Sequence, residues 1–246
     1  MDFTGKKVLV TGASRGIGLA TARAFLDCGA TVAVNGRTQQ SVDKARADLG
    51  SERTVAAPGD VIDKAGCDTV VGAALDGLGG LDVLVNNAGV FSLTPVATAS
   101  EADWDTMIDI NLKGPFFCIQ AALPALRAAK GNIVNTASES GIMGQPESSI
   151  YCASKGGLIN MSRSLALDLA PDVRINNVCP GGVDTDMMRA GTTTDADLDP
   201  ARAYAPLKRI ATPEEIAHAI LYLASDKAGF VTGATWQLDG GSTAGH

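Results

Sequence analysis

A doubly wound α/β fold, in which a seven-stranded parallel sheet carries helices on both faces, is the architecture that this sequence predicts. Short apolar runs rich in β-branched residues alternate with helical stretches along the 246 residues. The first of these runs leads directly into a glycine-rich turn and a helix, which is the opening half of a βαβ unit. No linker, repeat or low-complexity tract interrupts the pattern, so we expect a single domain over residues 1–246.

The elements follow one another in a regular order. The expected strands are seven apolar runs, which in chain order are residues 7–10, 31–34, 54–56, 83–85, 133–134, 175–178 and 235–238. After the first strand, a helix with apolar periodicity continues to a Cys28-Gly29 stop. The later helical stretches lie near residues 39–49, 63–77, 101–129, 151–169 and 213–224. This alternation, with right-handed crossovers, predicts parallel strands buried between two layers of helices.

One segment, residues 186–206, has no clear apolar periodicity and is long and polar, Gly191 included. We expect it to form a mobile lid over an active site. Three of its aspartates suggest a calcium loop only superficially, because Pro200 and Pro206 stand where the loop glycine and the bidentate glutamate belong. No metal site is expected in the chain.

Composition limits the partners that the chain is expected to bind. The net charge of −7 argues against nucleic acid and anionic membranes, both of which need a basic surface. The five cysteines are scattered and include no Cys-x-x-Cys pair, which favours reduced thiols in a cytoplasmic protein. No apolar run approaches the length of about 18 residues that a membrane-spanning helix needs.

The glycine-rich turn reads Thr-Gly-Ala-Ser-Arg-Gly-Ile-Gly at residues 11–18. Gly12 permits the tight turn, Gly16 lets the backbone approach a pyrophosphate, and Gly18 allows close packing of the helix. The N–H groups that begin the helix then face the phosphates of a dinucleotide. On this motif alone, an ordinary glycine-rich turn between strand and helix remains an alternative.

The same turn also fits the Gly-x-Ser-x-Gly nucleophile elbow of serine hydrolases at residues 12–16. A serine hydrolase needs several strands upstream of this turn to supply an oxyanion loop, and only one strand precedes Ser14. His218, in a predicted surface helix, and His246, at the end of the sequence, are the two histidines. Neither is placed to act as a buried general base, so we do not expect a hydrolase.

Tyr151 and Lys155 are four residues apart in a predicted helix, so their side chains lie on one face, one turn apart. An ammonium beside a phenol favours phenolate and lowers the tyrosine pKa from about 10 toward neutrality, where a proton donor or acceptor works best. Ser138 stands upstream at the end of a predicted strand. Taken alone, the Tyr-x-x-x-Lys spacing also fits a solvated helix face.

Further motifs follow the carboxyl ends of the predicted strands, where doubly wound sheets bind their ligands. Asp60-Val61 follows the third strand, Asn-Asn-Ala-Gly at residues 86–89 follows the fourth, and Pro-Gly-Gly-Val-Asp-Thr at residues 180–185 follows the sixth. Together with the glycine turn, Ser138 and the Tyr-x-x-x-Lys pair, these motifs resemble the short-chain dehydrogenase/reductase family from end to end. The resemblance implies a Rossmann fold and an enzyme that transfers hydride to or from a nicotinamide cofactor.

The resemblance also implies roles for four catalytic residues. Tyr151 would donate a proton to a carbonyl oxygen as hydride leaves the nicotinamide, or accept it in the reverse direction. Ser138 would hydrogen-bond the same oxygen, and Lys155 would hold the nicotinamide ribose hydroxyls. Asn111 would interrupt a helix and anchor a water for the proton relay. Pro115 agrees with a helix disruption there.

The same resemblance implies how the cofactor is held. The glycine turn would wrap its phosphates, residues after the third and fourth strands would contact adenine and ribose, and residues after the sixth would fix the carboxamide. Besides Tyr151 and Lys155, the expected cofactor-binding residues are Gly12, Ser14, Arg15, Gly16, Ile17, Gly18, Arg37, Thr38, Asp60, Val61, Asn87, Ala88, Gly89, Pro180, Gly181, Val183 and Thr185. Asp60 as a plain turn carboxylate is the alternative reading of that position.

The end of the second strand predicts NADP(H) in preference to NAD(H). Gly36 stands where NAD-specific members place an acid for the ribose 2′-hydroxyl, so a 2′-phosphate would meet no repulsion and would have room. Arg37 follows it, and Arg15 would approach the same phosphate from the opposite side, with guanidinium groups that can bind phosphate oxygens bidentately. Both arginines as solvated loop charges remain the alternative.

The predicted reaction interconverts a ketone and a secondary alcohol of modest size. The expected substrate-contacting residues are Ser138, Ser140, Gln145, Tyr151 and Met187, with Phe91, Pro146, Glu147 and Met188 also near the pocket. A rival within enzymes is reduction of 3-oxoacyl thioesters on an acidic acyl carrier protein. That partner requires a basic patch, for which the candidates, otherwise plain surface charges, are Arg127, Lys130, Arg174, Lys208 and Arg209. A non-catalytic dinucleotide sensor or scaffold is a more distant alternative, which would be expected to lose Tyr151 or Lys155.

We also expect a homo-oligomer, specifically a homotetramer with two-fold axes. The stretch from Phe230 to Leu238 is nearly uncharged and contains Trp236, and the resemblance implies that this region packs against a partner subunit. The alternative is that Trp236 covers the core of its own subunit.

Overall fold

Seven parallel strands form one sheet in the order β3-β2-β1-β4-β5-β6-β7 in the computed structural model, which describes residues 1–190 and 192–245. The strands are β1 (Lys7–Val10), β2 (Thr31–Gly36), β3 (Thr54–Pro58), β4 (Val83–Asn86), β5 (Asn132–Thr136), β6 (Arg174–Pro180) and β7 (Thr235–Leu238). Every neighbouring pair is parallel, as predicted. The strand order reverses between β1 and β4, which is the switch point where such sheets bind ligands.

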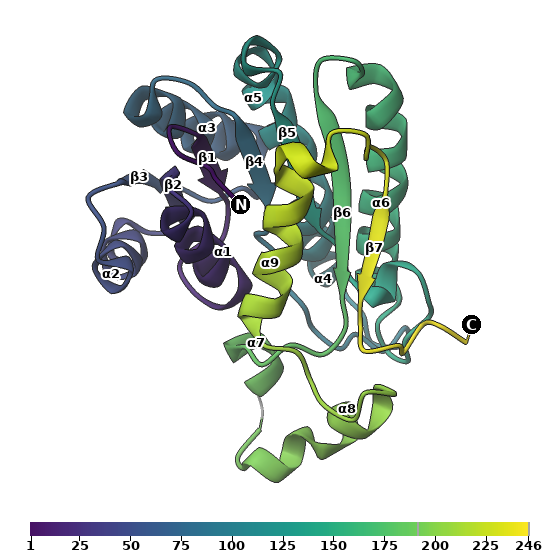
Figure 1. The fold of residues 1–246 in the computed structure, drawn as a ribbon. Coiled ribbons are helices and arrows are strands. Elements are labelled where there is room, and N and C mark those ends of the chain that lie inside the picture. The colour runs from purple at the N-terminus through teal and green to yellow at the C-terminus, as the bar shows by residue number, and fades with distance from the viewer. Residues whose placement is uncertain (191, 246) are drawn as a thin grey trace.

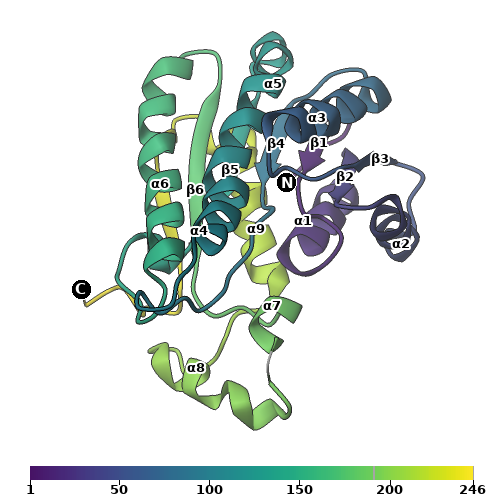
Figure 2. The same cartoon turned by 180° about the vertical axis from the view of Figure 1, so that it is seen from behind.

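Helices cover both faces of the sheet (Figure 1). The helix α1 (Gly16–Asp27) packs against α9 (Pro213–Ala224) on one face, and α2 (Gln39–Leu49) lies beside α1. Figure 2 shows the opposite face, covered by α3 (Lys64–Leu78), α4 (Glu101–Ile108), α5 (Gly114–Ala129) and α6 (Ser149–Leu169). The doubly wound α/β prediction is therefore confirmed.

The central strands are apolar on both faces because each face meets a helix layer. In β1, the side chains of Val8 and Val10 pack with α1 and α9, whereas Leu9 packs with the helices on the other face. All three are fully buried. The continuous apolar run of this strand thus supplies two separate cores, which fix the sheet between the helix layers.

A ladder of buried amides crosses the other half of the sheet. Asn86, Asn135 and Asn177 are in register on β4, β5 and β6. Asn86 Nδ2 donates to Asn135 Oδ1 at 2.9 Å, and Asn135 Nδ2 donates to Ser162 Oγ on α6, also at 2.9 Å. Ser162 Oγ donates to Asn177 Oδ1 at 2.7 Å. The ladder therefore ties the sheet to the helix that contains Tyr151 and Lys155.

The helical stretch over residues 101–129 is interrupted at Asn111, as the resemblance implied. A π-helical segment, Asp109–Lys113, separates α4 from α5, and Asn111 lies in it. Pro115 is the second residue of α5, in the first turn, where its missing N–H costs no hydrogen bond. Because α5 restarts there, the irregular backbone is confined to the turn just before the proline.

The segment 186–206 contains more regular structure than expected. It forms two short helices, α7 (Asp186–Arg189) and α8 (Asp199–Tyr204), beyond the carboxyl ends of the strands (Figure 1). Arg202 donates to Asp195 and Asp199, so these carboxylates serve the fold of the segment itself. Gly191 lies outside the described residues. That this segment acts as a mobile lid remains a prediction.

Candidate active site

A cleft of about 1580 Å³ opens along the carboxyl ends of the strands. It is lined by all the predicted cofactor and substrate residues except Gly18, which lies behind the glycine turn, and by the predicted catalytic residues except Asn111. Phe91, Pro146 and Met188 also line it. Glu147 does not, because its backbone turns through a positive φ of 55° and its side chain lies exposed outside the cleft.

One end of the cleft is closed by the glycine turn between β1 and α1. A Cβ atom on Gly12 would lie 2.8 Å from the Cα of Ala88, and one on Gly18 would overlap the carbonyl oxygen of Gly12. Arg15 precedes α1 with an extended backbone and forms no side-chain cap, so the first N–H groups of α1 are left for another acceptor. This tight, uncapped helix start fits the pyrophosphate of a dinucleotide.

Two asparagines brace the turn. Asn35 on β2, which is almost fully buried, accepts a hydrogen bond from Gly12 N at 3.0 Å and donates to Ala57 O at 2.8 Å. Asn87 Nδ2 donates to Thr11 O at 3.1 Å and to Gly12 O at 3.2 Å. Asn35 was not among the residues predicted from the sequence. Its position just before Gly36, as a polar residue at the end of an apolar strand, was the signal that it faces the turn.

The end of β2 forms a cationic corner of the cleft. Arg15, Arg37 and Lys44 all line it and all are exposed. A Cβ atom on Gly36 would lie 2.7 Å from Ser41 Oγ, so the Ser41 hydroxyl lies directly beside this glycine, and both residues line the cleft. The capping box Thr38-x-x-Ser41 at the start of α2 places Ser41 there.

The other end of the cleft contains Ser138, Tyr151 and Lys155. Ser138 follows β5, while Tyr151 and Lys155 lie in the first two turns of α6. Lys155 Nζ donates to Thr136 O at 2.9 Å and lies 5.8 Å from the centroid of the Tyr151 ring. The edge of Phe91 packs against the same ring, with centroids 4.9 Å apart. The three polar groups therefore meet around one point of the cleft wall.

Burial dominates the electrostatics at this point. It raises the pKa of Tyr151 to about 12, and the interaction with the Ser138 hydroxyl opposes that rise. Burial also lowers the pKa of Lys155 to about 8, because its ammonium is withdrawn from water. The sequence reasoning expected Lys155 to lower the tyrosine pKa. In this geometry the tyrosine pKa is instead raised, because burial dominates and the opposing contribution comes from Ser138 rather than from Lys155.

Asn111 does not line the cleft but connects the loop after β4 to α6 through its side-chain hydrogen bonds. Its Oδ1 accepts from Val90 N and its Nδ2 donates to Val90 O, both at 2.9 Å. Its second amide hydrogen goes to Ser154 Oγ at 3.2 Å, and Ser154 donates to Tyr151 O at 2.8 Å. Both hydrogens of the side-chain amide are thus used in holding the loop after β4 against α6, so the side chain has no donor left for a water.

The part of the cleft around Ser138 is lined by both polar and apolar side chains. Ser140 Oγ donates to Gln145 Oε1 at 2.7 Å, which fixes two predicted substrate residues to each other. Tyr204 of α8 reaches across to Met143, its hydroxyl 3.5 Å from the sulfur. Residues that line this part and were missed from the sequence are Leu93, Glu139, Met143, Ala201 and Tyr204.

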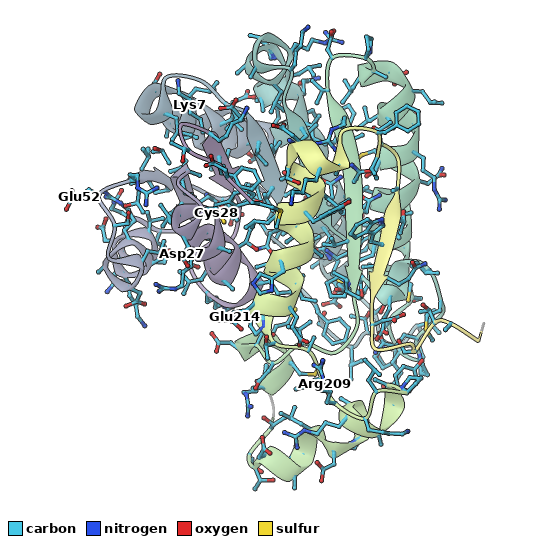
Figure 3. The ribbon with its side chains drawn as sticks, viewed as in Figure 1. Lys7, Asp27, Cys28, Glu52, Arg209 and Glu214 are labelled. Atoms are coloured by element: carbon cyan, nitrogen blue, oxygen red, sulfur yellow. The ribbon has the colours of Figure 1, made fainter. Side chains whose placement is uncertain are left out.

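The five cations proposed for carrier-protein docking do not form one patch. Arg127 and Lys130 end α5 just before β5 begins, at the amino ends of the strands. Arg209 lies toward the opposite end of the molecule, between α8 and the start of α9, as Figure 3 shows, and pairs with Glu215 at 2.7 Å. Arg174 is not a surface charge, because its half-buried guanidinium donates to the carbonyl oxygens of Leu223, Ser225 and Val231.

Within residues 1–190 and 192–245, no group of three or more His, Cys, Asp or Glu side chains is arranged to hold a metal ion. Nor is any helix of that part of the chain both long and apolar enough to cross a membrane. Cys28, Cys67, Cys118, Cys152 and Cys179 are all free thiols.

A dinucleotide-sized cleft with a glycine turn at one end and Ser138, Tyr151 and Lys155 at the other defines a nicotinamide-dependent oxidoreductase. The sequence model of the family described as "Enoyl-(Acyl carrier protein) reductase" matches residues 12–243. The chain belongs to the short-chain dehydrogenase/reductase family.

Several relatives are similar over nearly their whole length. Meso-2,3-butanediol dehydrogenase of Serratia marcescens is 41% identical over 245 residues, covering 99% of this chain and 97% of that protein. A 3-oxoacyl-[acyl-carrier-protein] reductase of Synechocystis sp. is 38% identical, covering 97% of both chains. A solved short-chain dehydrogenase/reductase of Brucella melitensis, described as of the glucose/ribitol dehydrogenase type, is 37% identical with a TM-score of 0.92, covering 98% of this chain and 99% of that one.

Proposed function

We propose that this enzyme transfers hydride between NADP(H) and a ketone or secondary alcohol of modest size. The observation that carries the proposal is the meeting of Ser138, Tyr151 and Lys155 at one end of the dinucleotide-sized cleft. A relative named for butanediol oxidation, 41% identical over almost the entire chain, supports an alcohol as substrate.

In the proposed mechanism the nicotinamide ring supplies or removes the hydride. Tyr151 donates its phenolic proton to the carbonyl oxygen of the substrate, and takes a proton back from the alcohol in the reverse direction. Its raised pKa keeps the phenol protonated at neutral pH, which favours the donor role. Ser138 hydrogen-bonds the same oxygen and stabilises the charge that develops on it.

Lys155 has a positional role in this proposal. Its ammonium donates to Thr136 O, which leaves two further N–H donors for the ribose hydroxyls of the cofactor. Asn111 holds the start of α6 through Ser154 and the loop after β4 through Val90. In this proposal Asn111 offers a water of the proton relay an acceptor and no side-chain donor, since both of its amide hydrogens are already used.

The cationic corner supports NADP(H) as the cofactor. Arg15, Arg37 and Lys44 surround the position where the adenosine ribose would lie, and the glycine at the end of β2 contributes no acid. Ser41 adds a hydroxyl beside the same position. A phosphate monoester on the ribose would find three cationic donors there.

Reduction of 3-oxoacyl groups on an acyl carrier protein is the second candidate, and the 38% identical reductase of Synechocystis sp. favours it. An acidic carrier needs a basic surface beside the cleft. The separation of Arg127 and Lys130 from Arg209, and the internal use of Arg174, argue against such a surface. We therefore place this candidate second.

We also propose a cytoplasmic homotetramer. Phe230 is fully exposed and Leu167 on α6 is 83% exposed, which is costly for a monomer. Trp236 stacks on Tyr222 and packs partly on its own core, so its contribution to an interface is smaller than expected. Light scattering at micromolar concentration tests the assembly, and a monomeric mass would refute it. Five free thiols are compatible with a reducing compartment.

A substrate screen tests the main proposal. NADPH oxidation is followed with simple ketones, ketoses and 3-oxoacyl thioesters, the thioesters offered both free and on a carrier protein. Turnover of small ketones supports the proposal. Activity confined to carrier-bound thioesters would replace it by the second candidate.

A further inference from the structure

Glu139 is a carboxyl group in the cleft wall that the hydride-transfer mechanism does not use. It follows Ser138 directly and begins a short 3₁₀ turn, Glu139–Gly141. It lines the cleft and also an adjoining chamber of about 200 Å³ beneath α8. The two spaces share Glu139 with Gly182, Ala201 and Tyr204. The carboxyl group therefore stands where the reaction site opens toward the lid segment.

Only one of the two carboxylate oxygens of Glu139 accepts a hydrogen bond from the described residues. Glu139 Oε2 accepts a hydrogen bond from the hydroxyl of Ser242, in the segment after β7. Over residues 1–190 and 192–245, no group donates a hydrogen bond to Oε1, and no Lys, Arg or His nitrogen lies within 4.0 Å of either oxygen. Nearby Asp239 is already satisfied by Gly241 N at 2.9 Å and by Thr243.

A half-buried carboxyl without a cation is an unfavourable arrangement. Burial raises the pKa of Glu139, and the negative charge of Asp239 raises it further. The negative charge of Glu139 in turn contributes to raising the pKa of Tyr151, so the two groups are within electrostatic reach of each other. Because Glu139 lines the cleft and its Oε1 accepts no hydrogen bond within the described residues, this oxygen is suited to a donor that arrives with the substrate.

We propose that Glu139 determines substrate specificity by accepting a hydrogen bond from a hydroxyl group next to the carbon that is oxidised or reduced. The preferred substrates are then vicinal diols and, in the other direction, α-hydroxy ketones. Ser138 bonds the reacting oxygen, and the next side chain along the backbone meets the neighbouring one. A substrate with a carboxylate at that position is repelled. This inference rests on the proposed function.

Four alcohols that share a three-carbon skeleton and react at the second carbon test the inference. Propan-2-ol offers no donor beside the reacting carbon, propane-1,2-diol offers a hydroxyl, 1-aminopropan-2-ol offers an ammonium, and lactate offers a carboxylate. A hydrogen bond to a charged group should raise kcat/KM for the diol over propan-2-ol by roughly ten- to a hundredfold. Lactate should be the poorest of the four.

Glu139→Gln removes the charge while keeping the shape and an acceptor for Ser242. The ratio of kcat/KM for the diol to that for propan-2-ol should fall by at least about tenfold. Loss of the charge also acts on Tyr151 with every substrate, so the ratio between the two alcohols, and not the rate with propan-2-ol, is the readout. Lactate should gain relative to propan-2-ol. Glu147→Gln is the matched control, since it removes the same charge from an exposed residue outside the cleft, and its ratio should not change. Thermal unfolding of each variant reports any loss of folding.

The outcomes separate this inference from the function on which it rests. An unchanged diol ratio in Glu139→Gln, an equal loss for both alcohols, or the same loss in Glu147→Gln would overturn the role of Glu139. A selective effect on 1-aminopropan-2-ol alone would also overturn it, in favour of a cationic substrate. Failure of wild type to oxidise any of the alcohols, or to reduce any ketone, would defeat the proposed function instead.

Discussion

Replacing Arg37 by alanine tests the proposal that the cleft prefers NADP(H) to NAD(H). Arg37 follows β2, lines the cationic corner, and forms no ion pair with any other part of the described chain. Its guanidinium therefore has no competing carboxylate to leave when a ribose 2′-phosphate binds. A hydrogen bond to a charged group contributes roughly 1.5–3 kcal/mol. Because Arg37 is exposed, we expect the lower part of that range, or about a tenfold loss of NADPH preference.

Arg15 provides the comparison. Its NH1 lies 3.6 Å from Asp186 Oδ2, with both side chains about two-thirds exposed at 66% and 67%. An exposed pair of this kind contributes about 0.2–1 kcal/mol, which binding of a phosphate must replace. Arg15→Ala should therefore cost less preference than Arg37→Ala, and Asp186→Ala should increase the preference slightly. Arg23→Ala, which removes the same charge on the far side of α1, should leave it unchanged.

The assay is kcat/KM with NADPH and with NADH at two salt concentrations. The preference of the wild type should weaken as ionic strength rises, because the cations are exposed. A wild type that uses NADH at least as well as NADPH would refute the reasoning about the cationic corner. An unchanged ratio in Arg37→Ala would remove Arg37 from it.

Two further predictions concern stability. Asn135→Ala leaves Asn86 Nδ2 without an acceptor and removes the donor to Ser162 Oγ, which keeps its own hydrogen bond to Asn177, so the free energy of unfolding in urea should fall by about 1–3 kcal/mol. A loss no larger than that for an exposed asparagine would contradict a structural role of the ladder. Lys155→Met should stabilise the fold at pH 7 by about 3 kcal/mol, because burial lowers the lysine pKa from 10.5 to about 8. At pH 7 the lysine is charged in both states and the burial penalty is complete, whereas above pH 10.5 it is neutral in both. The stability of wild type should therefore rise relative to Lys155→Met between pH 8 and 10.5, and a constant difference would contradict the origin of the shift.

The periodicity of apolar residues was enough to predict the seven strands and most helices, because parallel strands buried on both faces leave a plain pattern. The ends of β2, β3, β5 and β6 extend one or two residues further than predicted, into polar positions such as Asn35 and Thr136. The backbones of those residues pair with neighbouring strands, and a pattern of apolar side chains carries no information about backbone pairing.

Contacts between distant parts of the chain set the limits of prediction at the site. Glu139 meets Ser242 across 103 residues of sequence, and Ser41 lies beside Gly36 only because α2 folds back on β2. The direction of the Tyr151 pKa depends on how deeply the phenol is buried, which the Tyr-x-x-x-Lys spacing does not reveal. The sequence motifs were enough to identify the catalytic and cofactor-binding side chains. The burial and hydrogen-bond partners of those side chains could be learned only from the folded structure.

The central claim is that Tyr151 transfers the proton that accompanies the hydride. Tyr151→Phe keeps the ring that packs against Phe91 and removes only the hydroxyl. Turnover of the best ketone should fall by about 10²–10⁴-fold, the usual contribution of a general acid. Binding of NADPH, measured by isothermal titration calorimetry, should be unchanged. Retention of more than about a tenth of the wild-type kcat would contradict the account.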